Sequence, residues 1–282
     1  MRGTFQNMFA PPSLEYQDEI MRPTVKERPE FRVESALDMS SCYTGKHVIV
    51  TGASGAIGAE VSRILIESGA KVVLFGRDAK KLSKGAASYS IELTDNPLDL
   101  ESKFRQAMKD LKGVLHSLII CHGNQIAGGI RTLNLKLWDR SMIVNVRSVF
   151  MITSLAIPFL KLQKKENPSV CIISGDAGFD PYPGFTALSV AKAMINSFIE
   201  CAALEMAYHG IRINGVAPAF TNRNFELAQG TVVKTKGIDK TFYISEDQIP
   251  FKMHPYVREE LEEYPNEKII EAEEVADIAV WL

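Results

Sequence analysis

The chain has 282 residues, of which 46% are hydrophobic and 23% are charged, so it is long enough to bury one sizeable core. Its 32 Lys and Arg residues nearly balance its 34 Asp and Glu residues, which leaves no excess positive charge for nucleic acid or an anionic membrane surface. The longest apolar runs, such as residues 114–121, are far shorter than the roughly 20 residues that cross a bilayer. We therefore expect a globular protein with no nucleic-acid partner and no membrane span.

The four cysteines are scattered along the chain and form neither a CxxC pattern nor a disulfide framework. This usage favours a reducing, intracellular compartment. The first 14 residues carry one Arg and no acidic residue, but acidic residues follow at once, so the cytoplasm is favoured and mitochondria are left open. The histidines share no ligand spacing, so we expect no metal site.

Residues 1–43 predict an extended N-terminal arm, because prolines and mixed charges stand there without a sustained apolar period. The folded body is predicted over residues 44–282. Within it, residues 222–268 show little periodicity, a small basic cluster and an acidic run, which predict a lid or insertion. The chain ends at Leu282 inside an amphipathic pattern, so we expect the last part of the fold to be missing.

Short β-branched runs alternate with helical patterns through the folded body. Ile57, Val61 and Ile64 form one helical stripe that ends before Gly69, and Pro97 opens another helix. The predicted strands are residues 47–51, 71–75, 89–93, 114–121, 170–174 and 211–217. Each run is apolar almost throughout, as in a sheet covered on both faces. The repeated units predict an α/β fold of the Rossmann type, with a doubly wound parallel sheet and helices on both faces.

A glycine-rich turn follows the first predicted strand and precedes a helix. Its sequence is Thr51-Gly52-Ala53-Ser54-Gly55-Ala56-Ile57-Gly58. Glycines permit a tight turn and a close backbone approach, while the helix N-terminus offers unpaired N–H groups and a positive dipole. The turn therefore predicts binding of a dinucleotide pyrophosphate, and a strand-to-helix turn without a ligand is the alternative.

The end of the second predicted strand bears on the choice of dinucleotide. An NAD-selective protein places a carboxylate there on the ribose 2′-hydroxyl, whereas a guanidinium pairs with a 2′-phosphate. This chain has Arg77 at that point, which favours NADP(H) over NAD(H), and the neighbouring Asp78 argues the other way. An exposed arginine in a surface turn is the alternative.

The order and spacing of these motifs resemble the short-chain dehydrogenase/reductase family over residues 45–282. Besides the glycine-rich turn, the likeness is carried by residues 145–148, 172–178, Lys192, 211–218 and 273–277. The resemblance implies a nicotinamide dinucleotide cofactor and oxidoreductase chemistry. It also implies oligomers formed through the helices predicted near 134–163 and 188–209, and a last strand that this sequence lacks.

In this family a Tyr four residues before a Lys donates a proton to the substrate carbonyl, a Ser orients that carbonyl, and an Asn holds a water of the proton relay. The resemblance assigns the Asn to Asn145 and the Lys to Lys192. However, the Tyr position holds Leu188 and the Ser position holds Gly175. Neither side chain can donate a proton to a carbonyl.

The sequence offers three neighbouring hydroxyls as replacements. Ser174 is expected to face the other side of its strand, and Ser189 is rotated by about 100° around its helix from Leu188. Tyr182, in the segment that would border the substrate, is the candidate for a replacement proton donor.

The resemblance assigns further positions to the cofactor. The family's NNAG loop corresponds to Ile120-Cys121-His122-Gly123, where His122 is expected to fill space, and its adenine-side Asp corresponds to Glu92. The predicted cofactor-binding residues are Thr51, Gly52, Ser54, Gly55, Ile57, Gly58, Arg77, Glu92, Leu93, Gly123, Lys192, Pro218 and Thr221.

Three functions are compatible with these residues. The leading hypothesis is a short-chain dehydrogenase/reductase-like protein that binds NADP(H), has lost hydride-transfer catalysis and serves as a structural, regulatory or assembly subunit. A lost general acid costs about 10² to 10⁴ in rate. The alternative is an active NADP-dependent oxidoreductase that acts on a small carbonyl or alcohol with a donor such as Tyr182. A third possibility is a scaffold that binds no nucleotide.

Overall fold

The computed structural model describes residues 42–78, 82–83, 85–93, 97–126, 128, 130–131, 133–181, 184–219, 221–222, 233–236, 241–244 and 270–282. All of these residues lie in the unit Met39–Leu282. The arm predicted over residues 1–43 lies outside the described residues except for its last two, and so do most of the lid predicted over 222–268 and Tyr182. Within the lid segment, β8 (Val233–Lys236) and β9 (Thr241–Ile244) pair in antiparallel register.

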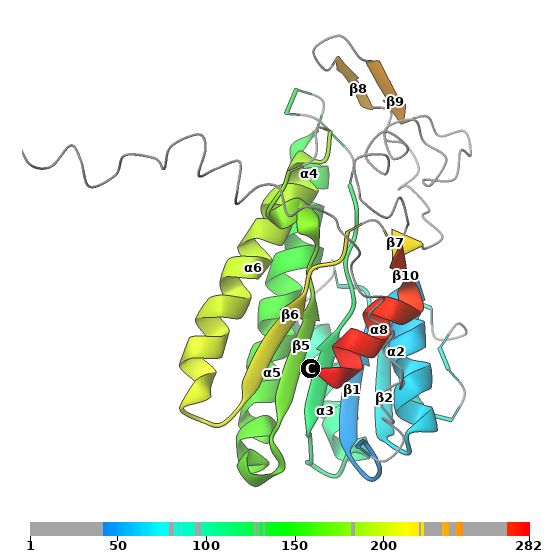
Figure 1. Cartoon of the computed structure of the whole chain (residues 1–282), viewed down its shortest axis with the longest axis vertical. Helices are drawn as coiled ribbons and strands as arrows, with labels where there is room; N and C mark the ends of the chain where they lie inside the picture. The colour runs from blue at the N-terminus through cyan, green and yellow to red at the C-terminus, as the bar shows by residue number, and fades with distance from the viewer. Residues whose placement is uncertain are drawn as a thin grey trace, which may run out of the picture. The chain divides into compact units, whose positions relative to one another are not determined.

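A six-stranded parallel sheet forms the centre of the described fold (Figure 1). Its strands are β1 (His47–Thr51), β2 (Lys71–Gly76), β3 (Ala87–Ser90), β4 (Ser117–Ile120), β5 (Ser169–Ile173) and β6 (Arg212–Val216). They lie in the order β3-β2-β1-β4-β5-β6. This arrangement confirms the predicted α/β fold of the Rossmann type, and β6 is the last strand of the sheet among the described residues.

Two strand predictions were wrong by more than one residue at an end. β3 stops at Ser90, not at residue 93, because Ser90 pairs with Gly76 and β2 ends there. The strand predicted from residue 114 starts at Ser117, because β1 pairs with it from Val48 onward. β3 is also largely exposed, which differs from the expectation of strands that are apolar throughout. As an edge strand it has one neighbour, so less of it is covered.

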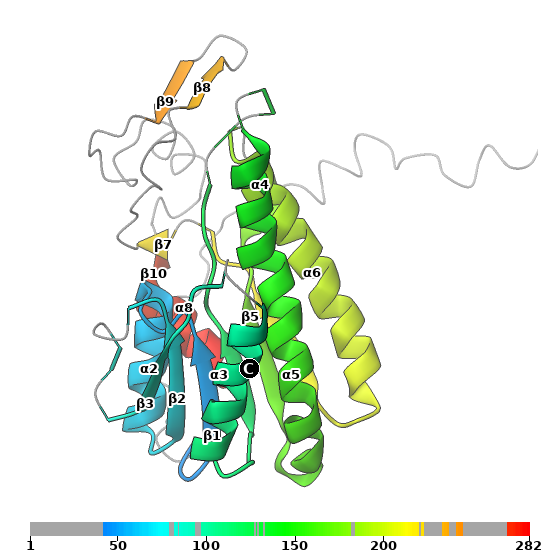
Figure 2. The same ribbon diagram turned by 180° about the vertical axis from the view of Figure 1, so that it is seen from behind.

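Helices cover both faces of the sheet (Figure 2). α2 (Ala56–Glu67) and α8 (Ala272–Trp281) pack on one face, and α3 (Pro97–Asp110), α5 (Ser148–Leu162) and α6 (Thr186–Ala207) pack on the other. α4 (Leu135–Met142) runs into α5 through a π-helical turn at Ile143–Arg147. The shorter elements are 3₁₀ turns at Lys164–Glu166 and Asp176–Gly178, and the strands β7 (Thr221–Asn222) and β10 (Ile270–Glu271), which pair with each other.

Strand alternation divides the core into two layers. Val48 and Val50 point toward α2 and α8, while Ile49 points toward α3 and α5, and all three side chains are fully buried. Burying one such side chain contributes about 1.5 to 3 kcal/mol. Both faces of the sheet are therefore covered by apolar side chains. The polar groups that could bind a ligand lie at the ends of the strands.

The end of α2 is set by Gly69, as the sequence predicts. Gly69 has a φ of 76°, its N–H donates to Ile66 O at 3.0 Å, and the N–H of Ala70 donates to Leu65 O at 3.0 Å. This pair of bonds is a Schellman motif, which a left-handed glycine closes without strain.

Tyr43, at the end of the arm predicted over residues 1–43, packs against the folded body. Tyr43 packs against the layer that contains α2 and α8, and its hydroxyl donates to Val280 O at 2.8 Å. The aromatic ring has apolar surface to bury, which the arm's polar composition concealed.

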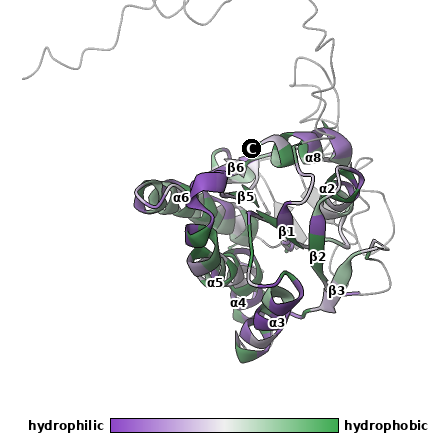
Figure 3. Ribbon diagram, turned by 90° about the horizontal axis from the view of Figure 1, so that it is seen from below, coloured by the Kyte–Doolittle hydropathy of each residue, from purple (hydrophilic) through white to green (hydrophobic). Residues whose placement is uncertain are grey.

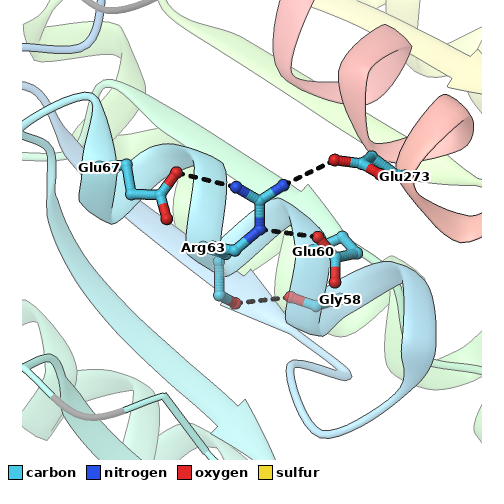
Figure 4. A network of polar contacts seen from close by, with 6 residues as sticks. Gly58, Glu60, Arg63, Glu67 and Glu273 are labelled. Carbon is cyan, nitrogen blue, oxygen red and sulfur yellow. Dashed lines mark hydrogen bonds and ion pairs between the residues drawn. The ribbon is translucent and has the colours of Figure 1, made fainter.

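An arginine links the two helices on that face of the sheet (Figure 4). On α2, Arg63 pairs with Glu60 and Glu67, each at 2.8 Å, and it also reaches Glu273 on α8 at 3.0 Å. Arg63 is 42% exposed, so each pair is worth no more than about 1 kcal/mol. The network mainly fixes α8 in register with α2.

Two helical segments, Leu135–Leu162 and Thr186–Ala207, are long and apolar enough to cross a membrane by length and composition alone. Hydrophobic residues recur around α5 and α6 (Figure 3). Both helices pack one side on the sheet, and the core helices of globular proteins meet the same criterion. The criterion is therefore weak evidence for a membrane span.

Candidate functional site

The predicted site residues gather at one edge of the sheet. Parallel strands all end at the same edge, and ligands of open α/β sheets bind there. Thr51 ends β1, Arg77 follows β2, and Gly123 and Gly175 follow β4 and β5. The structure thus brings together loops that are far apart in the sequence.

The glycine-rich turn has the backbone that a pyrophosphate needs. Gly52 has a φ of 65°, and a Cβ there would lie 2.5 Å from the backbone nitrogen of His122. A Cβ on Gly58 would lie 2.3 Å from Gly52 O, so neither position can hold a side chain without moving the backbone. Gly55 precedes α2, whose first turn carries no acidic residue. The N-terminus of α2 is therefore suited to an anion.

The end of β2 presents an exposed guanidinium beside this turn. Arg77 is exposed, and its backbone carbonyl accepts a hydrogen bond from Ser90 at 2.8 Å, which fixes its backbone. A Cβ on Gly76 would lie 2.9 Å from Ser54 Oγ, so the turn lies close to Arg77. Glu92 and Leu93 follow β3 and are half-buried.

Asn145 is buried within the π-helical turn that joins α4 to α5. Its Oδ1 accepts from the N–H of Asn124 at 2.9 Å. Its Nδ2 donates to Asn124 Oδ1 at 2.8 Å, to Asn124 O at 3.1 Å and to Ser141 Oγ at 3.1 Å. The side chain therefore holds the loop after β4 in place.

Lys192 lies beside this loop. A Cβ on Gly123 would lie 3.0 Å from Asn145 Oδ1 and 4.0 Å from Lys192 Nζ, so the amide and the ammonium group converge on Gly123. Lys192 Nζ donates to Ile173 O at 3.2 Å. The structure thus brings Asn145 and Lys192 together, as the sequence predicts.

His122, within the loop after β4, bridges β1 and α5. Its Nδ1 lies 2.7 Å from Thr51 Oγ1, and its Nε2 lies 2.7 Å from Ser148 Oγ on α5. Burial, together with the charge of Lys192, lowers the pKa of His122 to about 3, so the ring is neutral. The expectation that His122 only fills space was wrong, because the ring is hydrogen-bonded at both nitrogens.

A comparison with known protein families shows which family this chain is similar to. The model of the short-chain dehydrogenase family matches residues 46–230. The chain belongs to the short-chain dehydrogenase family. Its members are oxidoreductases with NAD(P)(H) cofactors, which agrees with the glycine-rich turn described above.

Relatives within the short-chain dehydrogenase family differ widely from this chain. Human "Dehydrogenase/reductase SDR family member 4" is 26% identical over 193 residues, which is 64% of this chain and 67% of the relative. "Glycine betaine reductase ATRR" of Emericella nidulans is 29% identical over 188 residues, but these make up 63% of this chain and 14% of that protein.

Solved structures show the same fold. The ligand-free aldohexose dehydrogenase of Thermoplasma acidophilum has a TM-score of 0.71 and 23% identity, covering 86% of this chain and 88% of that one. The 3-ketoacyl-(acyl-carrier-protein) reductase of Brucella melitensis, complexed with NADH, has a TM-score of 0.69 and 18% identity, covering 85% and 91%.

Leu188 and Gly175, to which the sequence resemblance assigns the family's two hydroxyl positions, both lie near Lys192. Leu188 lies one helical turn before Lys192 on α6 and is only 5% exposed. Gly175 has an extended backbone, and a Cβ there would lie 3.5 Å from Lys192 Cε. Ser174 lies just past the end of β5, and its hydroxyl points toward α6 rather than to the other side of the sheet, because it donates to Asn196 Oδ1, one helical turn after Lys192. Ser189 is buried as well.

In the segment after β6, residues 217–222, a backbone group rather than a side-chain hydroxyl contacts the neighbouring part of the site. Pro218 O accepts from the N–H of Asp176 at 3.2 Å, which ties this segment to the end of β5. Thr221, which was predicted to bind the cofactor, is buried, and its hydroxyl donates to Ala219 O at 3.1 Å.

Sequence reasoning missed two functional positions at this edge. Asn124 was not singled out, although it makes the contacts with Asn145, and His122 was assigned no bonds. The sequence feature that could have revealed His122 is its position in the loop that corresponds to the family's NNAG motif, where the family has Ala. Among the residues described, no cluster of three or more His, Cys, Asp or Glu side chains is placed to hold a metal ion.

Proposed function

We propose that this short-chain dehydrogenase family member binds NADP(H) at the carboxyl edge of its sheet and has lost the usual hydride-transfer catalysis. The observation that carries the proposal is Leu188, a buried hydrocarbon side chain one turn before Lys192, where the family places its proton donor. With Gly175 at the serine position, no side-chain hydroxyl at either position can bind the carbonyl oxygen. The protein then acts as a structural, regulatory or assembly subunit.

Titration with NADPH, followed by assays on a panel of carbonyls and alcohols, tests this function. We expect saturable binding with turnover no faster than in a Lys192→Ala control. A ligand at 100 times its Kd raises the free energy of unfolding by about 2.7 kcal/mol, so thermal unfolding gives a second measure of binding. Robust turnover contradicts the loss of catalysis, and the absence of saturation contradicts the cofactor.

The preference for NADP(H) over NAD(H) rests on Arg77. Its exposed guanidinium follows β2 beside the glycine-rich turn, where it can pair with a 2′-phosphate. Arg77→Ala should weaken NADPH binding about 10- to 100-fold and leave NADH binding unchanged, since a hydrogen bond to a charged group is worth roughly 1.5 to 3 kcal/mol. Arg105→Ala, at an exposed arginine on α3, is the matched control and should change neither affinity. Equal losses for both dinucleotides would contradict the assignment.

An active oxidoreductase is the second candidate function, and the convergence of Asn145 and Lys192 on Gly123 favours it. In that case another hydroxyl, such as that of Tyr182, supplies the proton. Tyr182→Phe then abolishes a measurable activity, whereas the loss of catalysis predicts no activity to abolish.

Association with a second copy is proposed through α5 and α6. Apolar side chains lie exposed on α6 and at its C-cap, including Leu204 at 81% and Tyr208 at 86%, and Phe150 on α5 is 56% exposed. Patches of this kind mark protein interfaces. Sedimentation should show that Leu204→Glu dissociates the oligomer. Ile130→Glu, at an equally exposed site outside both helices, should not.

We further propose an intracellular, reducing location, in the cytoplasm rather than in mitochondria. All four cysteines, Cys42, Cys121, Cys171 and Cys201, are free thiols, which supports a reducing compartment. Imaging of the tagged full chain against markers of both compartments tests the proposal.

A further inference from the structure

The bonds of His122 join the glycine-rich turn to the π-helical turn. The ring lies between Thr51, which ends β1, and Ser148, which begins α5. It is 9% exposed, so water competes little for these bonds. A simple space-filling side chain would not place two polar atoms at 2.7 Å from two hydroxyls.

The π-helical turn determines which way each proton points. The N–H of Ser148 donates to Ile143 O, five residues back. In an α-helix it would donate to Val144 O, so the π-helical turn leaves Val144 O without this backbone hydrogen bond. The Ser148 hydroxyl donates to Val144 O instead, at 2.7 Å. Because this hydroxyl has one proton, it can only accept from His122 Nε2–H.

The other ring nitrogen follows from this assignment. With Nε2 protonated in a neutral ring, Nδ1 is an acceptor, and the Thr51 hydroxyl donates to it. The bonds therefore run in one direction, from Thr51 through His122 and Ser148 to Val144. No member of this chain of bonds is left without a partner.

The backbone around His122 adds to the link. The turn at Gly52 packs directly on the His122 backbone, where no Cβ fits. Two residues further on, Asn124 is held by Asn145 within the same π-helical turn. The loop after β4 is therefore fastened to the phosphate-binding turn on one side and to the π-helical turn on the other.

We propose that His122 is a positioning residue that couples the glycine-rich turn to the π-helical turn, so that disturbing one loosens the other. Its effect on the dinucleotide rests on the proposed function, whereas the coupling itself exists without a ligand. His122 touches no reacting atom. It acts by holding Thr51 and the loop that carries Gly123.

Hydrogen exchange of the ligand-free protein tests the coupling. Ser148→Ala removes a hydroxyl that lies outside the glycine-rich turn, yet it should speed amide exchange in residues 51–58 by up to about tenfold, as expected for one lost hydrogen bond. His122→Leu should speed exchange in both turns, and His122→Gln, which can still donate to Ser148, should restore the π-helical turn. His116→Ala, at the opposite end of β4, is the matched control and should change neither.

NADPH binding supplies a second readout. His122→Leu should weaken it about tenfold, and His116→Ala should leave it unchanged. An exchange effect of Ser148→Ala that is confined to residues 141–148 overturns the coupling. Unchanged NADPH affinity in His122→Leu overturns its effect on the site. If the natural chain binds no NADPH, the proposed function fails, while the exchange result still decides the coupling.

A direct measurement covers the case in which His122→Leu does not fold. Nitrogen NMR of the natural chain should show His122 Nε2 protonated and Nδ1 unprotonated at neutral pH. The opposite tautomer overturns the direction of the bonds and with it the proposal.

Discussion

The proposed loss of catalysis predicts that introducing a hydroxyl at each of two positions, Gly175 and Leu188, creates reductase activity. Gly175→Ser fits the structure, because the backbone there is extended, with φ 179° and ψ 149°, and a Cβ would lie at an ordinary contact distance of 3.5 Å from Lys192 Cε. Leu188→Tyr would place a phenol one helical turn before Lys192, on the same face of α6. The doubly substituted chain then holds a proton donor, a carbonyl-orienting hydroxyl and the retained lysine together.

The expected gain is large enough to measure. A positioned general acid contributes about 10² to 10⁴ in rate, and one donor to a developing oxyanion contributes about 10² to 10³. These factors do not multiply, because the members of one catalytic unit are coupled. We therefore expect the double variant to oxidise NADPH with carbonyl substrates at least about 10²-fold faster than the natural chain.

The matched control differs by a single oxygen atom. Leu188→Phe combined with Gly175→Ser keeps the ring and the serine but removes the phenol hydroxyl, so it should show no gain. Adding Lys192→Ala to the double variant should also remove the gain. Equal rates for the Tyr and Phe variants, or a natural chain that already reduces carbonyls well, would refute the reasoning.

Three further predictions concern stability and binding. Gly58→Ala places a Cβ 2.3 Å from Gly52 O, so we expect dinucleotide titration to show no binding and thermal unfolding to show a lower Tm. Arg63→Ala should lower the free energy of unfolding by about 0.5 to 1 kcal/mol, less in high salt, because its contact with Glu273 is half-exposed. Since the pKa of His122 is about 3 in the folded state and about 6.5 unfolded, its neutral form stabilises the fold fully above pH 6.5. Below that pH His122 is protonated in the unfolded chain before it is protonated in the folded one. The free energy of unfolding measured by urea denaturation should therefore fall by up to about 1.4 kcal/mol per pH unit, and this pH-dependent loss should be absent in His122→Gln.

The fold could be predicted because its signals are local. β-branched runs, the glycine-rich turn and the caps of α2 each fix a short segment, and parallel connections leave few ways to join them. Strand ends were less predictable, since the end of β3 depends on where β2 ends, which is a property of the sheet. Tyr43 was misplaced for a similar reason, because its partner Val280 stands at the other end of the chain.

The candidate site could be predicted where a residue type is indispensable. Gly52 and Gly58 have no room for a side chain, and their spacing is visible in the sequence. The contacts of His122 could not be predicted, because they need a hydroxyl from β1, another from α5 and a π-helical turn that frees a carbonyl. No periodicity or motif in a single sequence predicts contacts that depend on three separate elements.

The two halves of the site depend on different physical features, so one can persist without the other. The phosphate-binding half consists of backbone, and changing Gly58 would strain the fold itself. Under the proposed function, the proton-donating half would consist of two side chains, and the residues present at those positions are compatible with stability: Leu188 is 5% exposed, and Gly175 has an unstrained, extended backbone. A buried leucine contributes about 1.5 to 3 kcal/mol, whereas a phenol there would need a hydrogen-bond partner. The proposed loss of two hydroxyls is therefore compatible with a gain in stability, whereas replacing Gly52 or Gly58 would strain the fold.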